Sequence, residues 1–328
     1  MLAGTEEAFQ TVVNFARYMS SASNPSGANP ESNSAALRAL LTGLIDYAGT
    51  FPPAKLSLEN AAGNFIAYLR GPHSWMLGKL IVPAAQLGQL RDLLRANPAA
   101  QDLACPVSVL LGAEPQRDAE LVRKAVAAHT SFPAISVDAV EFRPGSPAMI
   151  AEMAAALPKT VPAFCEIPVT EDMSAWLAAI HGAGWSAKIR TGGTTIESFP
   201  SASKVAEFIA QCYRHGVAFK ATAGLHHPVR SEHALTYEPN SACGAMHGFL
   251  NVFLGAALLE CGISAEQLVE ILDDTQAASF RFSGQSAHWN KLFLSANDLS
   301  ATRQRFAISF GSCSFEEPIS DLQQLGLL

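Results

Sequence analysis

The chain has 328 residues, of which 49% are hydrophobic and 16% are charged, a composition typical of a globular protein with a large buried core. Its formal net charge of -7 disfavours nucleic acid as the main partner, because phosphate binding requires clustered Lys and Arg. Its longest apolar runs, such as residues 248–259, are too short to span a bilayer, and its six cysteines are scattered without a C-x-x-C pair. We therefore expect a cytoplasmic enzyme that acts on a small molecule, with no nucleic-acid partner and no membrane partner.

Residues 1–35 differ in composition from the rest of the chain. The stretch TEEAFQTVVNFARYM has the spacing of an amphipathic helix with acidic residues in its first turn. The stretch SSASNPSGANPESNS that follows is rich in Ser, Asn, Pro and Gly, as flexible linkers are. We predict an N-terminal helix and linker over residues 1–35 and a separate folded unit over residues 36–328.

From residue 36 onward, short apolar runs alternate with segments of helical periodicity. In SASKVAEFIAQCYRHG, for example, Ser201 can cap a helix and Gly216 can end it. Strands that alternate with helices indicate parallel βαβ units, and eight of them predict a closed (β/α)₈ barrel of the TIM type. The eight predicted strands are residues 43–51, 78–83, 107–112, 135–142, 163–168, 186–193, 218–224 and 307–312.

The segment between the seventh and eighth predicted strands, residues 225–305, is long for a connection in such a barrel. It begins with a loop, HHPVRSEHALTYEPNSACG, and continues with an apolar helix from about Met246. A second helix is predicted after the capping box of Ser264 and Gln267, and a hairpin is predicted around Ser283 and Gly284. An insert at the catalytic end of a barrel can be a lid over the active site.

The same insert can instead be a contact between subunits. Phe249, Val252 and Phe253 lie on one face of its apolar helix, and we expect this face to pair with a second copy of the chain. The protein is therefore expected to be a homodimer or a higher homo-oligomer.

Catalytic side chains in a TIM barrel come from the C-terminal ends of the strands and the loops that follow. Alternation puts Lys188 and Arg190 on one face of the sixth strand, and the outward face packs on helices. We expect Lys188 and Lys220 to point into the barrel, with Glu166 adjacent and Asp46 across. The predicted catalytic residues are Lys188, Lys220, Glu166, Glu141 and Asp46. The predicted substrate-binding residues are Arg190, Thr191, Gly192, Gly193, Thr222, Gly224, His226, Gly311 and Ser312.

Most of these groups also have a structural interpretation. Lys188 and Lys220 can form buried salt bridges with Glu166 and Glu141. The glycine steps after the strands can be plain turns, or they can offer backbone N–H groups to an anion. Cys313 lacks an evident base nearby in the sequence, which favours a buried structural thiol over a nucleophile.

A second signal is a group of possible metal ligands after the seventh strand, namely His226, His227, His233, Cys243 and His247. Their spacing matches no structural zinc pattern. His226 or His227 can still hold a divalent metal such as zinc together with Glu166. This alternative predicts a metal-dependent lyase, isomerase or hydrolase, whereas the lysine-dependent alternative needs no cofactor.

The blocks AKIRTGG, FKATAGLHHP, MHGFLNVF and FGSCSFEEP resemble an uncharacterised bacterial family of hypothetical proteins, which implies no activity. Over two of these blocks, lysines on the sixth and seventh strands are each followed by a turn with Thr and Gly. This arrangement resembles class I barrel aldolases of the deoxyribose-phosphate aldolase type. The resemblance implies that Lys188 forms the Schiff base and that Lys220 lowers its pKa. Arg190 and the pair His226-His227 depart from the pattern of that family.

A lysine with the free pKa of about 10.4 is protonated at neutral pH and cannot attack a carbonyl. If Lys188 and Lys220 face each other inside the barrel, burial and the second positive charge should lower the pKa of one of them. Glu166 or Glu141 can then move protons, and Arg190 can grip a carboxylate or phosphate of the substrate. We predict a lysine-dependent lyase, aldolase or isomerase that acts on a small anionic carbonyl compound, such as an oxo-acid or a sugar-like molecule. A non-catalytic barrel that binds an anion is the third possibility.

Overall fold

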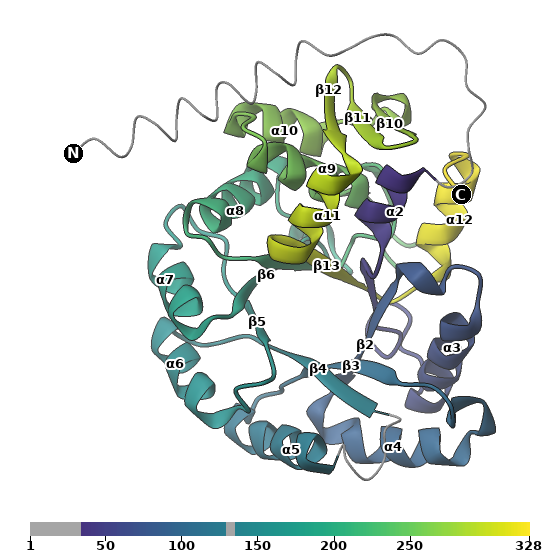
Figure 1. Cartoon of the computed structure of the whole chain (residues 1–328), viewed down its shortest axis with the longest axis vertical. Coiled ribbons are helices and arrows are strands. Elements are labelled where there is room, and N and C mark those ends of the chain that lie inside the picture. Colours follow the sequence, from purple (N-terminus) through teal and green to yellow (C-terminus); the bar gives the residue numbers. More distant parts are fainter. Residues whose placement is uncertain (1–33, 129–134) are drawn as a thin grey trace.

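The alternating apolar runs form a closed barrel of parallel strands, as predicted. The computed structural model describes residues 34–128 and 135–328, so the helix predicted near the N-terminus lies outside the described residues. Each strand pairs with the next along the chain, and the last strand closes the barrel against the first. Figure 1 shows helices surrounding this barrel, which confirms the (β/α)₈ fold. The barrel strands are β1 (Ile45–Tyr47), β2 (Leu77–Pro83), β3 (Cys105–Leu110), β4 (Ile135–Phe142), β5 (Ala163–Glu166), β6 (Ser186–Arg190), β7 (Phe219–Thr222) and β13 (Ala307–Ser312).

Serine side chains cap the N-termini of several helices outside the barrel. In α8, the side chain of Ser201 accepts a hydrogen bond from the N–H of Lys204, and Gly216 takes up the left-handed conformation after the last turn. These helices are α2 (Ala35–Leu41), α3 (Leu58–Arg70), α4 (Leu87–Ala96), α5 (Pro115–Ala127), α6 (Pro147–Ala156), α7 (Ser174–Ala183), α8 (Ala202–Arg214) and α12 (Glu316–Gln324). Short 3₁₀ turns are η1 (Ser74–Met76), η2 (Ala84–Gln86), η3 (Pro98–Ala100), η5 (Ile196–Ser198) and η6 (Ala277–Ser279).

The insert between β7 and β13 contains two small sheets and three helices among the described residues. The capping box of Ser264 and Gln267 opens α10 as predicted, and the hairpin at Ser283 and Gly284 is present with a third strand added. The segment predicted as a loop after β7 contains an antiparallel hairpin, β8–β9, that the sequence analysis missed. The elements of the insert are β8 (Ser231–Ala234), β9 (Cys243–Met246), α9 (Phe249–Glu260), α10 (Ala265–Asp273), β10 (Phe280–Ser283), β11 (Ser286–Trp289), β12 (Leu292–Ser295) and α11 (Ala296–Arg305).

The helix α9 is buried inside the chain rather than on its surface. The side chain of Phe249 stacks on Phe310 of β13 at 5.4 Å between ring centroids, and Phe253 stacks on Phe219 of β7 at 6.2 Å. Phe249, Val252 and Phe253 are fully buried. The expectation that this face binds a second copy of the chain is therefore wrong, because the barrel and the other insert helices already cover it. In Figure 1, α9 and α11 lie beside β13, where a barrel helix is needed between the last two strands.

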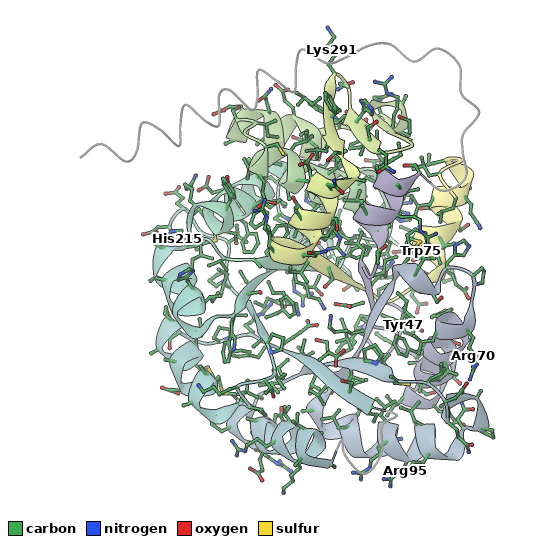
Figure 2. The ribbon with its side chains drawn as sticks, viewed as in Figure 1. Tyr47, Arg70, Trp75, Arg95, His215 and Lys291 are labelled. Carbon is green, nitrogen blue, oxygen red and sulfur yellow. The ribbon has the colours of Figure 1, made fainter. Side chains whose placement is uncertain are left out.

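Side chains fill the space within and around the barrel (Figure 2). Apolar residues from the outward faces of the strands pack against the helices in one continuous core. No helix in the described ranges combines the length and the apolar character that crossing a membrane requires.

Candidate active site

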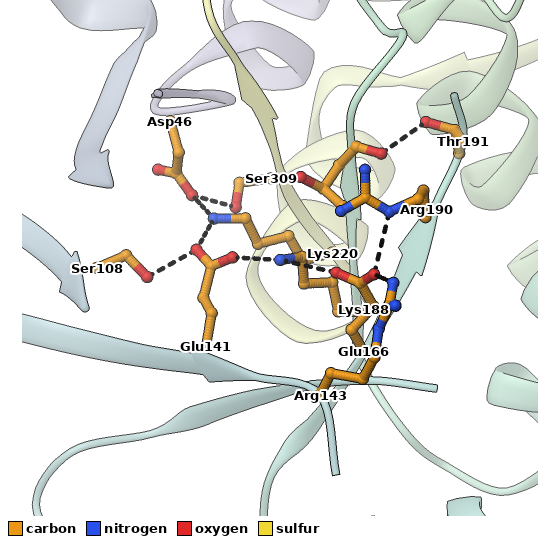
Figure 3. Close-up of polar contacts among 11 residues, drawn as sticks. Asp46, Ser108, Glu141, Arg143, Glu166, Lys188, Arg190, Thr191, Lys220 and Ser309 are labelled. Atoms are coloured by element: carbon orange, nitrogen blue, oxygen red, sulfur yellow. Dashed lines mark hydrogen bonds and ion pairs between the residues drawn. The ribbon is translucent and has the colours of Figure 1, made fainter. Parts of the chain in front are cut away.

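Two lysines on adjacent strands point into the barrel, as the alternation predicts. Lys188 of β6 and Lys220 of β7 occupy paired positions in the register of these strands. Lys188 is 4% exposed and Lys220 is 0% exposed. Figure 3 shows that both lysines belong to one chain of ion pairs, which runs through Asp46, Lys220, Glu141, Lys188 and Glu166.

Lys220 is an ammonium group enclosed by carboxylates. Its Nζ donates to Asp46 of β1 and, at 2.6 Å, to Oε1 of Glu141 on β4. Burial alone would lower the pKa of Lys220, but the two carboxylates overcome this effect and raise it. The expectation that one lysine of the pair has a lowered pKa does not apply to Lys220, because Asp46 and Glu141 both contact its Nζ.

Glu141 connects the two lysines. Its Oε1 accepts hydrogen bonds from Lys220 and from the hydroxyl of Ser108 at 2.7 Å, and its Oε2 lies 2.8 Å from Nζ of Lys188. The Oε2 contact has the distance of an ion pair but not the alignment of a hydrogen bond, since no aligned donor reaches that oxygen. Burial opposes the charge of Glu141, yet Lys188 and Lys220 hold its pKa well below the usual range.

Asp46 anchors the other end of the chain of ion pairs. Its Oδ1 accepts the backbone N–H of Lys79 at 2.7 Å, and its Oδ2 accepts from Lys220 and from the hydroxyl of Ser309 at 2.8 Å. Burial works against ionisation, but Lys220 lowers the pKa of Asp46 below its ordinary value. This arrangement depends on Gly78, because a Cβ at that position would overlap Oδ1 of Asp46.

Glu166 at the end of β5 links the buried lysines to two arginines. Its Oε2 lies 3.1 Å from Nζ of Lys188, while its Oε1 accepts from Arg143 and from Nε of Arg190 at 3.1 Å. Burial raises the pKa of Glu166, but Lys188 and the two arginines together lower it to about 2. Among the described residues, the two terminal nitrogens of Arg190 have no hydrogen-bond or ion-pair partner. The side chain of Arg190 is 48% exposed.

A pocket of about 310 Å³ lies at the C-terminal ends of the strands, with Lys188 and Glu141 among its lining residues. This volume is at the small end of the range for ligand pockets, ~300–1,000 Å³, and fits a small molecule. The predicted site residues that line it are Glu141, Lys188, Arg190, Gly193, Thr222, Gly224, His226, His227 and Gly311. The predicted site residues that do not line it are Asp46, Glu166, Thr191, Gly192, Lys220 and Ser312. Glu166 and Arg190 also border a neighbouring cavity of about 630 Å³.

Thr191 and Gly192 hold the loops around the pocket together. The hydroxyl of Thr191 donates to the carbonyl of Ala223 at 2.6 Å, and its backbone N–H donates to Thr222 at 2.9 Å. A Cβ on Gly192 would lie 2.9 Å from the Cα of Gly224, so the glycine lets the two loops approach closely. These residues therefore shape the pocket without lining it.

The β8–β9 hairpin forms part of the pocket wall. Ala234 of β8, Met246 of β9 and three residues after β8, namely Leu235, Thr236 and Tyr237, line the cavity. These residues were not predicted as part of the site, because SEHA and CGAM lack the β-branched and aromatic residues that mark strands.

The two histidines after β7 are paired with carboxylates of α12. Nδ1 of His226 lies 2.7 Å from Oε2 of Glu317, and Nδ1 of His227 lies 2.6 Å from Oδ2 of Asp321. Glu166, which the metal alternative assigned to the same site, instead contacts Lys188 and the two arginines. Over residues 34–128 and 135–328, no group of three or more His, Cys, Asp or Glu side chains has the geometry to hold a metal ion.

Cys313, one residue after β13, has a base that the sequence did not reveal. Its Sγ lies 3.8 Å from Nε2 of His226, and both residues line the pocket. Tyr237 and Glu317 lie beside this pair, and the hydroxyl of Tyr237 donates to Glu317 at 3.1 Å. His226 and Cys313 lie on different strand–helix loops, so no local motif signals their contact.

A scan of the chain against models of known protein families finds no match, and a search of curated proteins finds no relative. The geometry of the pocket is therefore the basis for an assignment of function.

Proposed function

We propose that the protein is a lysine-dependent lyase or isomerase for a small anionic carbonyl compound, with Lys188 as the residue that bonds to the carbonyl carbon. Closed (β/α)₈ barrels are commonly enzymes with their sites at this end of the strands. The observation that carries the proposal is the position of Lys188, at the point where the buried chain of ion pairs meets the pocket.

Lys188 is better suited to this role than Lys220. Lys220 is fully buried, does not line the pocket, and has a raised pKa, so it remains a cation. Its positive charge instead keeps Glu141 and Asp46 ionised inside the barrel, next to Lys188. Lys188 lines the pocket beside these fixed charges, and a carbonyl group in the pocket can approach it.

Arg190 supplies the affinity for an anion. Its guanidinium lines the same pocket, is about half exposed, and has two terminal nitrogens without partners among the described residues. A guanidinium can bind a carboxylate or phosphate through two parallel hydrogen bonds. The substrate would then have its anionic group on Arg190 and its carbonyl group near Lys188.

Glu166 is the proton acceptor that would free the amine of Lys188. Its pKa is held at about 2 by Lys188, Arg190 and Arg143 against the effect of burial. A substrate anion on Arg190 would compete for one of these positive charges, and the basicity of Glu166 would rise. Lys188 could then pass a proton to Glu166, 3.1 Å away, and attack the carbonyl carbon. The carbonyl oxygen leaves as water, taking one hydrogen from the amine and the proton returned by Glu166, and an iminium bond to Nζ remains.

Borohydride reduction tests the proposal, because it converts such an iminium into a stable amine. The protein is incubated with a panel of 2-oxo acids, aldehydes and sugar phosphates, reduced, digested and analysed by mass spectrometry. An adduct on Lys188 is expected, absent in Lys188→Met and retained in Lys291→Met, a matched change on the exposed surface. Arg190→Lys should weaken trapping of the anionic compounds, since a lysine cannot form the paired hydrogen bonds.

Two other outcomes contradict the proposal. If no compound labels Lys188 in the folded protein, a barrel that only binds anions becomes the better explanation. If turnover occurs without an adduct and is abolished by a chelator, the metal-dependent alternative through His226 or His227 gains support.

A further inference from the structure

A second reactive group faces the pocket beside the lysine site. Cys313 directly follows the end of β13, and its side chain lines the pocket together with Gly311. Ser309 of the same strand contacts Asp46 inside the barrel. The side chain of Cys313 therefore meets the cavity rather than the outer helices.

The imidazole of His226 lies between Cys313 and Glu317, an arrangement that can activate a thiol. Glu317 Oε2 lies 2.7 Å from Nδ1 of His226, a contact that requires the proton on Nδ1 when the imidazole is neutral. Nε2 then faces Sγ of Cys313 at 3.8 Å with a free lone pair. This is the order of nucleophile, base and orienting carboxylate that generates reactive thiolates.

The surroundings favour the protonated form of His226. Burial by itself would lower the pKa of His226, but the contacts with Cys313 and Glu317 raise it to about 10. Glu317 also accepts the hydroxyl of Tyr237, which lies 3.7 Å from Sγ. The titratable groups around the pair are Tyr47, His227, His233, Tyr237 and Glu317.

We propose that Cys313 and His226 form a thiolate–imidazolium pair, positioned by Glu317, and that the thiolate removes a proton from the carbon next to the substrate carbonyl. In this step the C–H bond breaks, the proton goes to Sγ, and the electron pair moves toward the carbon bound to Lys188. The same thiol returns the proton to carbon when the product forms, so no oxidant or reductant is needed. The role as base rests on the proposed function of Lys188, whereas the ion pair itself does not.

The ion pair is tested by thiolate absorbance at 240 nm, which does not depend on access of a reagent to the buried sulfur. The difference between wild type and Cys313→Ser is followed against pH on chelator-treated protein, so that no bound metal holds the thiolate. An absorbance already present at pH 6 is expected, well below the free thiol pKa of about 8.5. His226→Asn, measured against its own Cys313→Ser double variant, should shift the onset above pH 8.

The variant His227→Asn and the exposed thiol of Cys243 serve as controls for the test of the thiolate. His227→Asn changes the neighbouring histidine, whose partner is Asp321, and should leave the absorbance unchanged. Alkylation by iodoacetamide, mapped by peptide, should depend much less on pH at Cys313 in wild type than at Cys313 in His226→Asn, with the exposed Cys243 as the reference for reagent activity. A wild-type thiolate signal that appears only near pH 8.5, or one unaffected by His226→Asn, overturns the ion pair.

The role of the thiolate is tested by deuterium uptake from D₂O into whichever compound borohydride traps on Lys188. Cys313→Ser should retain the borohydride adduct yet lose deuterium uptake by about 10²–10⁴-fold, the usual contribution of a general base. Uptake as fast as in wild type overturns this role. A wild type without any Lys188 adduct refutes the proposed function instead, and the absorbance experiment still decides whether the thiolate pair exists.

Discussion

Replacing Lys220 by Met should destabilise the protein strongly, because it removes the cation that Asp46 and Glu141 share. The methionine keeps the apolar stem of the side chain, so the change acts mainly on the charge. Asp46 would retain the hydroxyl of Ser309 and the N–H of Lys79, and Glu141 would retain Ser108 and Lys188. Breaking a buried ion pair by removal of one partner costs about 3–5 kcal/mol of unfolding free energy.

The same change at Lys188 should cost less, about 1–2 kcal/mol. Glu141 would keep Lys220, and Glu166 would keep both of its arginines. The loss of unfolding free energy should therefore be larger for Lys220→Met, at the fully buried position, than for Lys188→Met, at the position that lines the pocket. A double variant, Lys220→Met with Asp46→Asn, removes one stranded carboxylate and should recover part of the lost stability.

The pH dependence of the stability lost in Lys220→Met tests whether the stranded carboxylates cause the loss. In the wild type Lys220 helps to lower the pKa values of Asp46 and Glu141, so their stabilisation is present above about 3.8 and 4.5 and is lost as pH falls further. Without Lys220, less positive charge offsets the effect of burial, and the pKa values of Asp46 and Glu141 rise. The deficit of Lys220→Met relative to wild type should thus be largest at pH 7 and smaller at pH 5.

Urea unfolding followed by tryptophan fluorescence at both pH values measures these differences. A loss of less than about 1 kcal/mol at pH 7 would refute the reasoning. So would a deficit that stays constant between pH 7 and pH 5, because the stranded carboxylates would then not be its cause.

Three further predictions follow from single contacts. Gly78→Ala should lower the unfolding free energy by about 1–3 kcal/mol, since its Cβ would overlap Asp46; Gly63→Ala, which meets nothing within 4 Å, is the control in the same urea assay. Glu166 stabilises the fold above its unfolded pKa of 4.5 and loses this effect as pH falls toward 2, so Glu166→Gln should flatten the acid limb of a thermal melting series. Ser264→Ala should cost about 1 kcal/mol in urea, because it removes the capping box of α10; no measurable change would contradict that assignment.

Local patterns in the sequence were sufficient to predict the barrel. A period of two in the apolar runs and a helical period between them are properties of neighbouring residues, and they place the eight barrel strands and the helices between them. The inward direction of Lys188 and Lys220 follows from the same alternation. The capping box of Ser264 and the left-handed Gly216 are equally local, so both could be predicted without a structure.

The tertiary structure decided which groups meet inside the barrel. Glu141 comes to lie between the two lysines because of how β4 is aligned with the other strands, and together with Asp46 it raises the pKa of Lys220. The apolar face of α9 is buried because β7 and β13 cover it, whereas periodicity alone cannot distinguish a core helix from a subunit contact. Cys313 and His226 are 87 residues apart, and the pairing of β13 with β7 across the long insert brings them together. Periodicity determines which way a side chain points, but its partner depends on strand register and chain closure, which involve residues far apart in the sequence.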